Sequence, residues 1–258
     1  MISVVIPTYK RPDLLSRLLE SISVQTLLPD EVIVIDDCSQ MYEAYQIVIQ
    51  AFKDKLPSLY FHSLEQNSGA PVARNTGIKM AKGAWIALVD DDDEWLPEKL
   101  EKQWSLIQLS TDAKLGLVYT WTKAVGINGQ ASYDSKMSVK GDAVKALLTT
   151  NFIMSASVMV KKDAIIKAGL FDETMPSCQD WEMWSRIALK GYHIDVVEEV
   201  LTLYHRHGGE SIGLGSKAKQ GYYLFLKKFW KPIILRTSLI NILKKFYLYL
   251  NVRSAKKL

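Results

Sequence analysis

Five consecutive carboxylates, Asp90 to Glu94, are the residues of this sequence whose type and spacing point most directly to chemistry. Adjacent carboxylates repel one another and raise each other's pKa, so such a run is either fully solvated or neutralised by a cation. Residues 84–89 before it have the composition of a buried strand, and residues 95–97 after it predict a helix whose N-terminus would hold Asp93 and Glu94. The run therefore predicts a cation site at the ligand-binding edge of an α/β sheet, with a solvated turn as the alternative.

The elements that must position this run alternate between strand and helix over the first 110 residues. The patterns predict strands at 3–6, 31–35, 59–62 and 84–89, with helices at 12–22, 42–53, 70–82 and 97–110. This alternation predicts a mostly parallel sheet with helices on both faces. Further along, we expect strands at 115–125, 156–160 and 196–204, helices at 141–150 and 179–190, and a polar loop over 126–139.

The composition is that of a globular protein with room for one large α/β domain or two small ones. Of 258 residues, 48% are hydrophobic and 23% are charged. Two cysteines give no disulfide framework, the four histidines have no zinc-finger spacing, and the N-terminus lacks a signal-peptide pattern, so a reducing cytoplasm is expected. Because the glycine-rich dinucleotide and P-loop motifs are absent, a phosphate-bearing ligand would need another anchor, such as a divalent metal on the acidic run.

The net charge of +4 is unevenly distributed. Residues 217–258 hold eleven Lys or Arg and no Asp or Glu, while residues 1–216 hold 21 basic and 28 acidic side chains. The basic residues of this segment are interspersed with Trp, Tyr and Phe, which favours a helix lying on an anionic membrane surface. An amphipathic helix packed on the body is the alternative. The acidic body argues against nucleic acid as a partner.

Four motifs that occur in order along the chain narrow the class of protein. They are Val4-Val5-Ile6-Pro7-Thr8-Tyr9-Lys10-Arg11-Pro12, Val34-Ile35-Asp36-Asp37-Cys38-Ser39, Asn67-x-Gly69 with Ala73-Arg74-Asn75-x-Gly77, and Val89-Asp90-Asp91-Asp92-Asp93-x-Trp95. Together they closely resemble the family 2 glycosyltransferases over about the first hundred residues. Gln179-Asp180-Trp181-Glu182 resembles the family's later Glu-Asp signature, which extends the resemblance to about residue 212.

The resemblance implies a GT-A fold: a Rossmann-like, mostly parallel α/β sheet flanked by helices, with a basic helical C-terminal tail in this chain. It implies one domain over 1–212, with a nucleotide-sugar-binding half at 1–110 and an acceptor-binding half at 111–212, followed by the tail at 213–258. A nucleotide-sugar donor, UDP-linked by preference, and a divalent metal, Mn²⁺ or Mg²⁺, are implied with it.

The site residues follow from the same resemblance. The donor-binding residues it implies are Pro7, Thr8, Tyr9, Arg11, Asp36, Arg74, Asp90 and Asp91. Asp92 and His207 are the implied metal ligands, Asp180 is the implied catalytic base, and Gln179 and Trp181 are implied to contact the acceptor. Gln179 stands where the family usually has Glu, which leaves the acceptor's identity open.

For four of these residues the sequence also allows a structural role. Asp36 could accept the imide N–H of a base or could stabilise a turn. Arg74 could meet a diphosphate or lie exposed on its helix, Asp180 could be a helix N-cap, and His207 could be a surface histidine.

The activity that the resemblance implies is inverting transfer of a sugar to a glycan hydroxyl. The acceptor it leads us to expect is a lipid-linked polysaccharide or lipopolysaccharide intermediate at the cytoplasmic face of the cell membrane. A nucleotidyltransferase that makes a sugar nucleotide is the alternative enzyme class. A membrane-associated glycan-binding protein on the same fold is the non-enzymatic alternative, although it would be expected to have lost Asp92 or Asp180.

Overall fold

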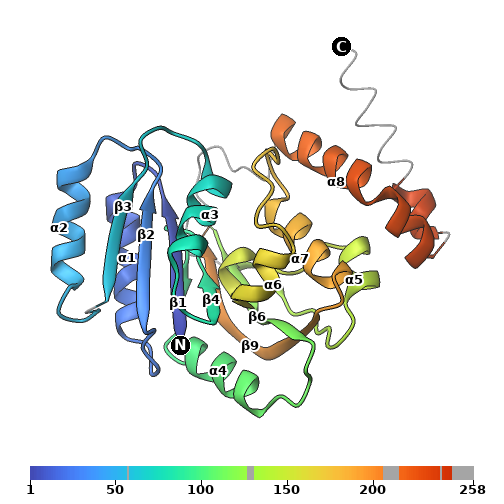
Figure 1. Cartoon of the computed structure of the whole chain (residues 1–258), viewed down its shortest axis with the longest axis horizontal. Coiled ribbons are helices and arrows are strands. Elements are labelled where there is room, and N and C mark those ends of the chain that lie inside the picture. The colour runs from blue at the N-terminus through green and yellow to red at the C-terminus, as the bar shows by residue number, and fades with distance from the viewer. Residues whose placement is uncertain (57, 127–130, 206–214, 239, 246–258) are drawn as a thin grey trace.

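The strands that the structure describes form one nine-stranded sheet. Helices pack beside this sheet (Figure 1). The computed structural model describes residues 1–56, 58–126, 131–205, 215–238 and 240–245. Within them the strands follow the order β3-β2-β1-β4-β8-β6-β9-β5, with β7 paired to β6. Six of these strands run in one direction, which agrees with the expected mostly parallel sheet.

The N-terminal half consists of β-α units, as the alternating pattern predicts. Its strands are β1 (Ile2–Thr8), β2 (Glu31–Asp36), β3 (Leu59–Ser63) and β4 (Trp85–Leu88), and its helices are α1 (Pro12–Ser23), α2 (Tyr42–Phe52) and α3 (Ala70–Met80). All four strands are parallel, and Thr8 pairs in register with Asp36. The carboxyl ends of β1, β2 and β4 therefore meet at one edge of the sheet.

The C-terminal half continues the same sheet. Its elements are β5 (Glu94–Trp95), α4 (Lys99–Leu109), β6 (Leu115–Val125), β7 (Ala131–Ser135), α5 (Val144–Thr149), the 3₁₀ turn η1 (Ser155–Ser157), β8 (Val158–Lys161), α6 (Lys162–Lys167), α7 (Gln179–Leu189), β9 (His193–His205) and α8 (Gly215–Arg236). Strand β8 joins antiparallel to β4, so a direct strand pair connects the two halves.

Alternate residues of the central strands enter two separate apolar layers. On one face, Val4, Ile6 and Val34 pack with α1, α2 and α4. On the other, Val5 and Ile35 pack with α3, α5, α7 and α8. This period of two is the expected pattern of strands buried on both sides.

Two local predictions are wrong, and one short helix has no prediction. Asp93 and Glu94 do not begin a helix, because Glu94 and Trp95 form β5 and pair with Leu203 and Thr202 of β9, and α4 begins only at Lys99. Part of the expected loop at 126–139 is β7, which pairs with β6. The short helix α6 was not predicted. Strands as short as two residues depend on a partner far along the chain, which local patterns do not reveal.

Helix α8 lies against α5 and α7, at the end of the molecule opposite α2 (Figure 1). Its buried side chains, Phe225, Leu226, Phe229 and Ile233, are at most 3% exposed and belong to the larger apolar cluster. The described part of the basic segment thus uses its aromatic face for packing, while Lys227, Lys231 and Leu235 remain exposed. Among the helices described, none combines the length and the apolar character needed to cross a bilayer.

Candidate functional site

Polar side chains from three strand ends converge at the carboxyl edge of the sheet. Thr8 ends β1, Asp36 ends β2, and Asp90 follows β4 after one residue, Val89. Because β1 lies between β2 and β4, Thr8 sits at the centre of this edge. The sheet order therefore places the acidic run beside the Pro7-Thr8-Tyr9 segment.

Asp91 lies inside the protein rather than on the open edge. Its side chain is 0% exposed, accepts a hydrogen bond from Thr8 Oγ1 at 2.7 Å, and lies 2.7 Å from Nη2 of Arg11. Burial raises the pKa of Asp91 to about 7, and the charge of Arg11 and the Thr8 hydroxyl oppose that rise. Tyr45 completes the group, because its hydroxyl bonds to Thr8 Oγ1 at 2.9 Å and accepts from the backbone N–H of Arg11.

Asp92 is more accessible, with 20% of its side chain exposed. Arg11 donates from Nη1 to Asp92 Oδ2 at 2.7 Å, and Arg17 donates to the Asp92 backbone carbonyl at 2.5 Å. Two arginines thus supply positive charge at a run for which the sequence predicted a metal cation. Arg17 and Tyr45 were not predicted, since both stand among ordinary helical residues and only the sheet order brings them here.

Arg74 connects the acidic run to helix α7. It is 7% exposed, and its guanidinium donates to Asp90 Oδ1 at 2.5 Å and to Gln179 Oε1 at 3.0 Å. Its carbon Cζ also lies 5.5 Å from the centre of the Phe171 ring. The alternative of an exposed helical arginine is therefore wrong, and one side chain links the two halves of the domain across 105 positions of sequence.

Asp180 follows Gln179 in the first turn of α7. Burial raises the pKa of Asp180; the backbone N–H of Trp181 and the charge of Arg74 oppose the rise, and Asp90 adds to it. The N–H of Trp181 donates to Asp180 Oδ1 at 2.7 Å. Asp180 is thus a partly buried carboxylate with a raised pKa that lies within electrostatic reach of Arg74 and Asp90, which is the environment of a general base.

The far end of the acidic run contacts strand β9. Asp93 is 2% exposed, and burial raises its pKa well above the usual range, with repulsion from Asp92 and Asp90 adding to the rise. Its carboxylate accepts from the backbone N–H of His205, and His205 Nε2 lies 3.1 Å from Glu94 Oε2. His207, the histidine preferred from the sequence, lies outside the described residues.

The remaining donor-side residues differ in accessibility. Asp36 is 1% exposed, and its carboxylate accepts from the backbone N–H and hydroxyl of Ser39 and from Ser63 Oγ at 2.8 Å. Its described contacts are those of a turn-stabilising aspartate. Pro7 is buried within β1, whereas Tyr9 is 38% exposed with Lys10 Nζ 5.1 Å from its ring centre.

Trp181 does not present an open face to an acceptor. It is 5% exposed, its indole N–H donates to the Leu147 carbonyl at 2.5 Å, and its ring stacks on Phe225 with centres 3.8 Å apart. Lys245 Nζ covers the same ring at 4.9 Å. Phe225 of α8 and Lys245 therefore cover the ring of Trp181 in this arrangement, and the acceptor contact expected at this residue stays a prediction.

The donor atoms of the acidic run fit a hard divalent cation. Asp90 and Asp92 keep 32% and 20% of their side chains exposed at the ligand-binding edge, and both offer carboxylate oxygens. In the part of the chain that the structure describes, no three His, Cys, Asp or Glu side chains are grouped to hold a metal by themselves. Mg²⁺ characteristically binds in this incomplete way, through one or two carboxylates plus substrate phosphates and water.

Solved structures share this fold. A mannosyltransferase from Pyrobaculum calidifontis, in complex with GDP-Man and Mn²⁺, matches 98% of this chain and 73% of its own with a TM-score of 0.71 at 18% identity. S. aureus TarS in complex with UDP-GlcNAc matches 98% of this chain and 72% of its own, also with a TM-score of 0.71, at 21% identity. The observed arrangement is therefore the expected GT-A fold.

Sequence comparison identifies the family. The putative colanic acid biosynthesis glycosyl transferase WcaA of Escherichia coli is 29% identical over 242 residues, covering 88% of this chain and 81% of its own. An uncharacterized glycosyltransferase of Methanocaldococcus jannaschii is 29% identical over 234 residues, covering 90% and 80%. The family model for glycosyl transferase family 2 matches residues 3–168, which carry Thr8, Arg74 and the acidic run. This chain belongs to glycosyl transferase family 2.

Proposed function

We propose that this protein is an inverting glycosyltransferase that moves a sugar from a nucleotide-sugar donor to a hydroxyl of a glycan acceptor. The observation that carries the proposal is Arg74, which contacts Asp90 on the donor side and Gln179 next to Asp180. A guanidinium in that place would hold a diphosphate within reach of the group that activates the acceptor.

In the proposed reaction Asp180 takes the proton of the acceptor hydroxyl. The acceptor oxygen forms a bond to the anomeric carbon while the bond from that carbon to the diphosphate oxygen breaks, and the diphosphate leaves with the bonding electrons. A single displacement inverts the anomeric centre. A positioned base of this kind contributes about 10²–10⁴ in rate, and the raised pKa of Asp180 brings it nearer to neutral pH, where such a base works best.

Arg11 and Arg74 would bind the donor diphosphate through their fork of N–H donors. A divalent metal, Mn²⁺ or Mg²⁺, would be held by Asp92 with Asp90 beside it, and when bound it stabilises the negative charge of the leaving diphosphate. Tyr9, which is exposed beside the strand ends, would stack on the base or ribose. We favour UDP as the nucleotide because the family resemblance points to it, and the structural neighbours' complexes include UDP-GlcNAc and GDP-Man.

The acceptor we propose is a glycan in polysaccharide biosynthesis, carried on a lipid at the cytoplasmic membrane face. The names of two relatives support this class: WcaA and the putative teichuronic acid biosynthesis glycosyltransferase TuaG of Bacillus subtilis, which is 35% identical over 103 residues. The exposed basic face of α8 supports the location, because Lys227, Lys231 and Arg236 point away from the body.

A donor panel tests the proposal. The protein is mixed with UDP-GlcNAc, UDP-glucose, UDP-galactose or GDP-mannose, with and without Mn²⁺ or Mg²⁺, and nucleotide release is measured. Asp180→Asn is expected to bind the active donor normally and to release nucleotide at least about 100-fold more slowly. Asp92→Asn is expected to lose metal-dependent donor binding.

The matched control is Asp54→Asn, which removes an exposed carboxylate between α2 and β3. It is expected to behave as the wild type. Undiminished release by Asp180→Asn would assign the base elsewhere, and full activity in EDTA would remove the metal from the mechanism.

A further inference from the structure

One stripe of helix α8 follows the segment that leads into the first turn of α7. Lys217, Gly221, Phe225 and Lys228 are spaced by four, four and three residues, which places them on a single helical face. Ser177 Oγ donates to the Lys217 carbonyl at 3.0 Å, and the Phe225 ring stacks on Trp181 at an interplanar angle of 19°. The stripe thus contacts residues on both sides of Asp180.

Gly221 allows the helix to approach closely. A Cβ atom at this position would lie 2.6 Å from the carbonyl oxygen of Ser177, a distance that real Cβ atoms do not adopt. Ser177 precedes Cys178, which has a left-handed φ of 56° and is the N-cap of α7. Helix α8 therefore lies in direct contact with the turn that sets the direction of α7.

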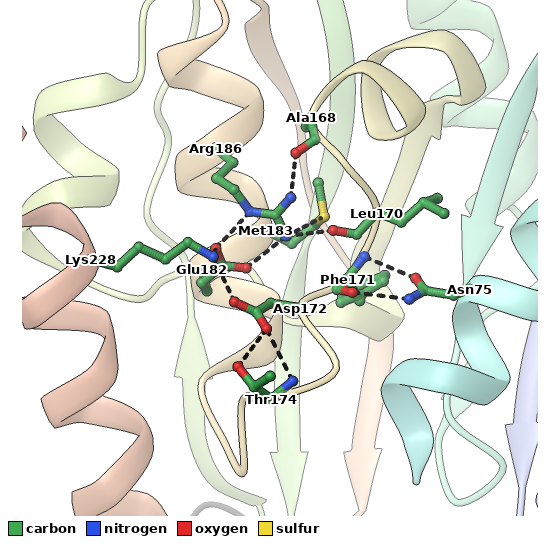
Figure 2. Close-up of polar contacts among 10 residues, drawn as sticks. All are labelled: Asn75, Ala168, Leu170, Phe171, Asp172, Thr174, Glu182, Met183, Arg186 and Lys228. Carbon is green, nitrogen blue, oxygen red and sulfur yellow. Dashed lines mark hydrogen bonds and ion pairs between the residues drawn. The ribbon is translucent and has the colours of Figure 1, made fainter. Parts of the chain in front are cut away.

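Lys228 extends the stripe into an ionic group built around the buried Glu182 (Figure 2). Glu182 is 0% exposed, and Arg186 holds both of its oxygens, from Nε to Oε1 at 2.6 Å and from Nη2 to Oε2 at 2.7 Å. Lys228 Nζ reaches Glu182 Oε1 at 2.6 Å and Asp172 Oδ2 at 2.7 Å. Because two carboxylates meet a single ammonium here, removal of Lys228 leaves Asp172 without this ion pair and Glu182 with one cation fewer.

Other contacts hold the loop of residues 168–178 from its opposite side. Asn75 pairs with the backbone of Phe171 in both directions, at 2.9 Å for each bond, and Arg186 donates to the carbonyls of Ala168 and Leu170 (Figure 2). Asn75 adjoins Arg74, the contact of Asp90 and Gln179. The loop is thus fixed between α3, which carries the donor-side arginine, and α8.

We propose that Lys228 is a positioning residue for the transfer reaction and that α8 sets the place of the base. By joining Asp172 in the loop to Glu182 in α7, Lys228 fixes the turn from which Asp180 faces Arg74 and Asp90. The role assigned to Asp180 rests on the proposed function. The link between Lys228 and the geometry of this turn rests on the contacts alone.

The test uses the full chain with Lys228→Met, with Lys227→Met as the matched control. Lys227 is the adjacent exposed lysine on α8, and the substitution removes the same charge. Backbone amide hydrogen exchange is followed in peptides covering residues 170–182. In Lys228→Met we expect exchange there to be about tenfold faster, with peptides of β1 and β2 unchanged, whereas Lys227→Met should match the wild type.

The same variants are assayed for donor affinity and nucleotide release with the sugar nucleotide that the wild type turns over. Lys228→Met should bind this donor with a Kd within about twofold of wild type but release nucleotide about 10- to 100-fold more slowly, because misplacement of a reacting group by about 1 Å has effects of this size. Lys228→Arg should restore most of the rate, since it keeps both ion pairs.

Gly221→Ala tests the inference without changing charge. Alanine favours the helical state of α8, but its Cβ would push the turn at Ser177, so we expect the same slow release with unchanged donor affinity. Wild-type exchange over 170–182 in Lys228→Met overturns the positioning role. Wild-type release in Asp180→Asn overturns the proposed base, so the two failures are distinguishable.

Discussion

At the scale of single residues, Arg11 is the main counter-charge of the acidic run. It bridges Asp91, which is fully buried, and Asp92, which is partly exposed. Arg11→Met should lower the free energy of unfolding in EDTA by about 1–3 kcal/mol, less than for a fully buried pair because 42% of the Arg11 side chain is exposed.

The loss should depend on pH. Burial raises the pKa of Asp91 to about 7, so its carboxylate is charged above that pH and largely neutral well below it. Arg11 therefore neutralises a full buried charge only at the higher pH, and its loss should cost more stability there. Urea unfolding of wild type and Arg11→Met at about pH 8 and about pH 5.5 measures the difference. An equal loss at the two values would contradict this assignment, and Lys10→Met, an exposed neighbour, is the control.

Lys99 is a second buried titratable group whose effect on the pH dependence of stability can be measured separately. It is 0% exposed on α4, donates to Gln103 Oε1 at 2.7 Å, and lies 4.1 Å from the ring centre of Trp95. Burial lowers the pKa of Lys99 well below 10.5. At pH values between the pKa of Lys99 in the folded state and its pKa in the unfolded state, the unfolded chain holds one more proton than the folded chain. The free energy of unfolding therefore rises with pH over this range, by up to about 1.4 kcal/mol per pH unit.

Lys99→Met should abolish this rise. We expect urea unfolding from about pH 7 to about pH 10 to show stability increasing more steeply with pH in the wild type than in the variant. Lys102→Met, at a half-buried lysine on the same helix that pairs with Glu98 and Glu199, should leave the Lys99 contribution in place. Parallel pH profiles for wild type and Lys99→Met would show that the buried amine does not titrate in this range.

The sequence predicted the polar residues of the site better than their partners. The strand ends located Thr8, Asp36 and Asp90 at one edge, because parallel strands bring their carboxyl ends together. The contact of Arg74 with Gln179 could not be foreseen, since it depends on how the loop before α7 folds back onto α3. The burial of Trp181 could not be foreseen for the same reason, because Phe225, which covers its ring, is 44 residues away in the sequence.

At the scale of elements, the packing of α3 on the sheet depends on Gly77. A Cβ atom there would lie 2.5 Å from Val5 Cγ1 and 3.3 Å from Ile35 Cγ1. Gly77→Ala should therefore push α3 away from β1 and β2 and lower the free energy of unfolding by about 1–3 kcal/mol, despite the better helix propensity of alanine.

Displacement of α3 should also weaken donor binding, because α3 carries Arg74. Thermal unfolding and donor affinity measured on the same variant test both effects, with Lys79→Gly at an exposed position of the same helix as a control for propensity alone. A Gly77→Ala protein more stable than the wild type would show that the helix and strands accommodate the methyl group.

The helices and strands of the first half were predictable because local period and turn residues agree with the final fold. Predicted helices at 42–53 and 70–82 correspond to α2 and α3. In the second half, β5 forms by pairing with β9, and β7 forms by pairing with β6. The sequence pattern within a few residues does not indicate such distant partners.

At the scale of the whole molecule, the basic segment has a buried face and an exposed one. Deletion of α8 would uncover Trp181 and remove Phe225, Phe229 and Ile233 from the core, so truncation would confuse folding with membrane binding. Substitution of exposed residues separates the effect on membrane binding from the effect on folding. Lys231 and Arg236 are both exposed, and Leu235 between them is 80% exposed.

Lys231→Gln with Arg236→Gln should weaken association with vesicles rich in anionic lipid by about 30-fold, since each basic residue near such a surface contributes about 1 kcal/mol. Co-sedimentation measures the binding at low salt. The control is Lys53→Gln with Lys79→Gln, which removes the same charge from exposed positions on other elements. Equal binding by both double variants would place the contact on another surface.

The pairing of β4 with β8 has a consequence for biosynthesis. During translation β1, β2 and β3 emerge before β4, but β8, which covers the other edge of β4, lies 70 residues further along the chain. At about 5–20 residues per second, a nascent chain exposes that apolar edge for several seconds or more. The sheet of the donor-binding half is therefore complete only after β8 has been made, and a ribosome-bound intermediate ending near residue 110 presents a strand edge on which chains could aggregate.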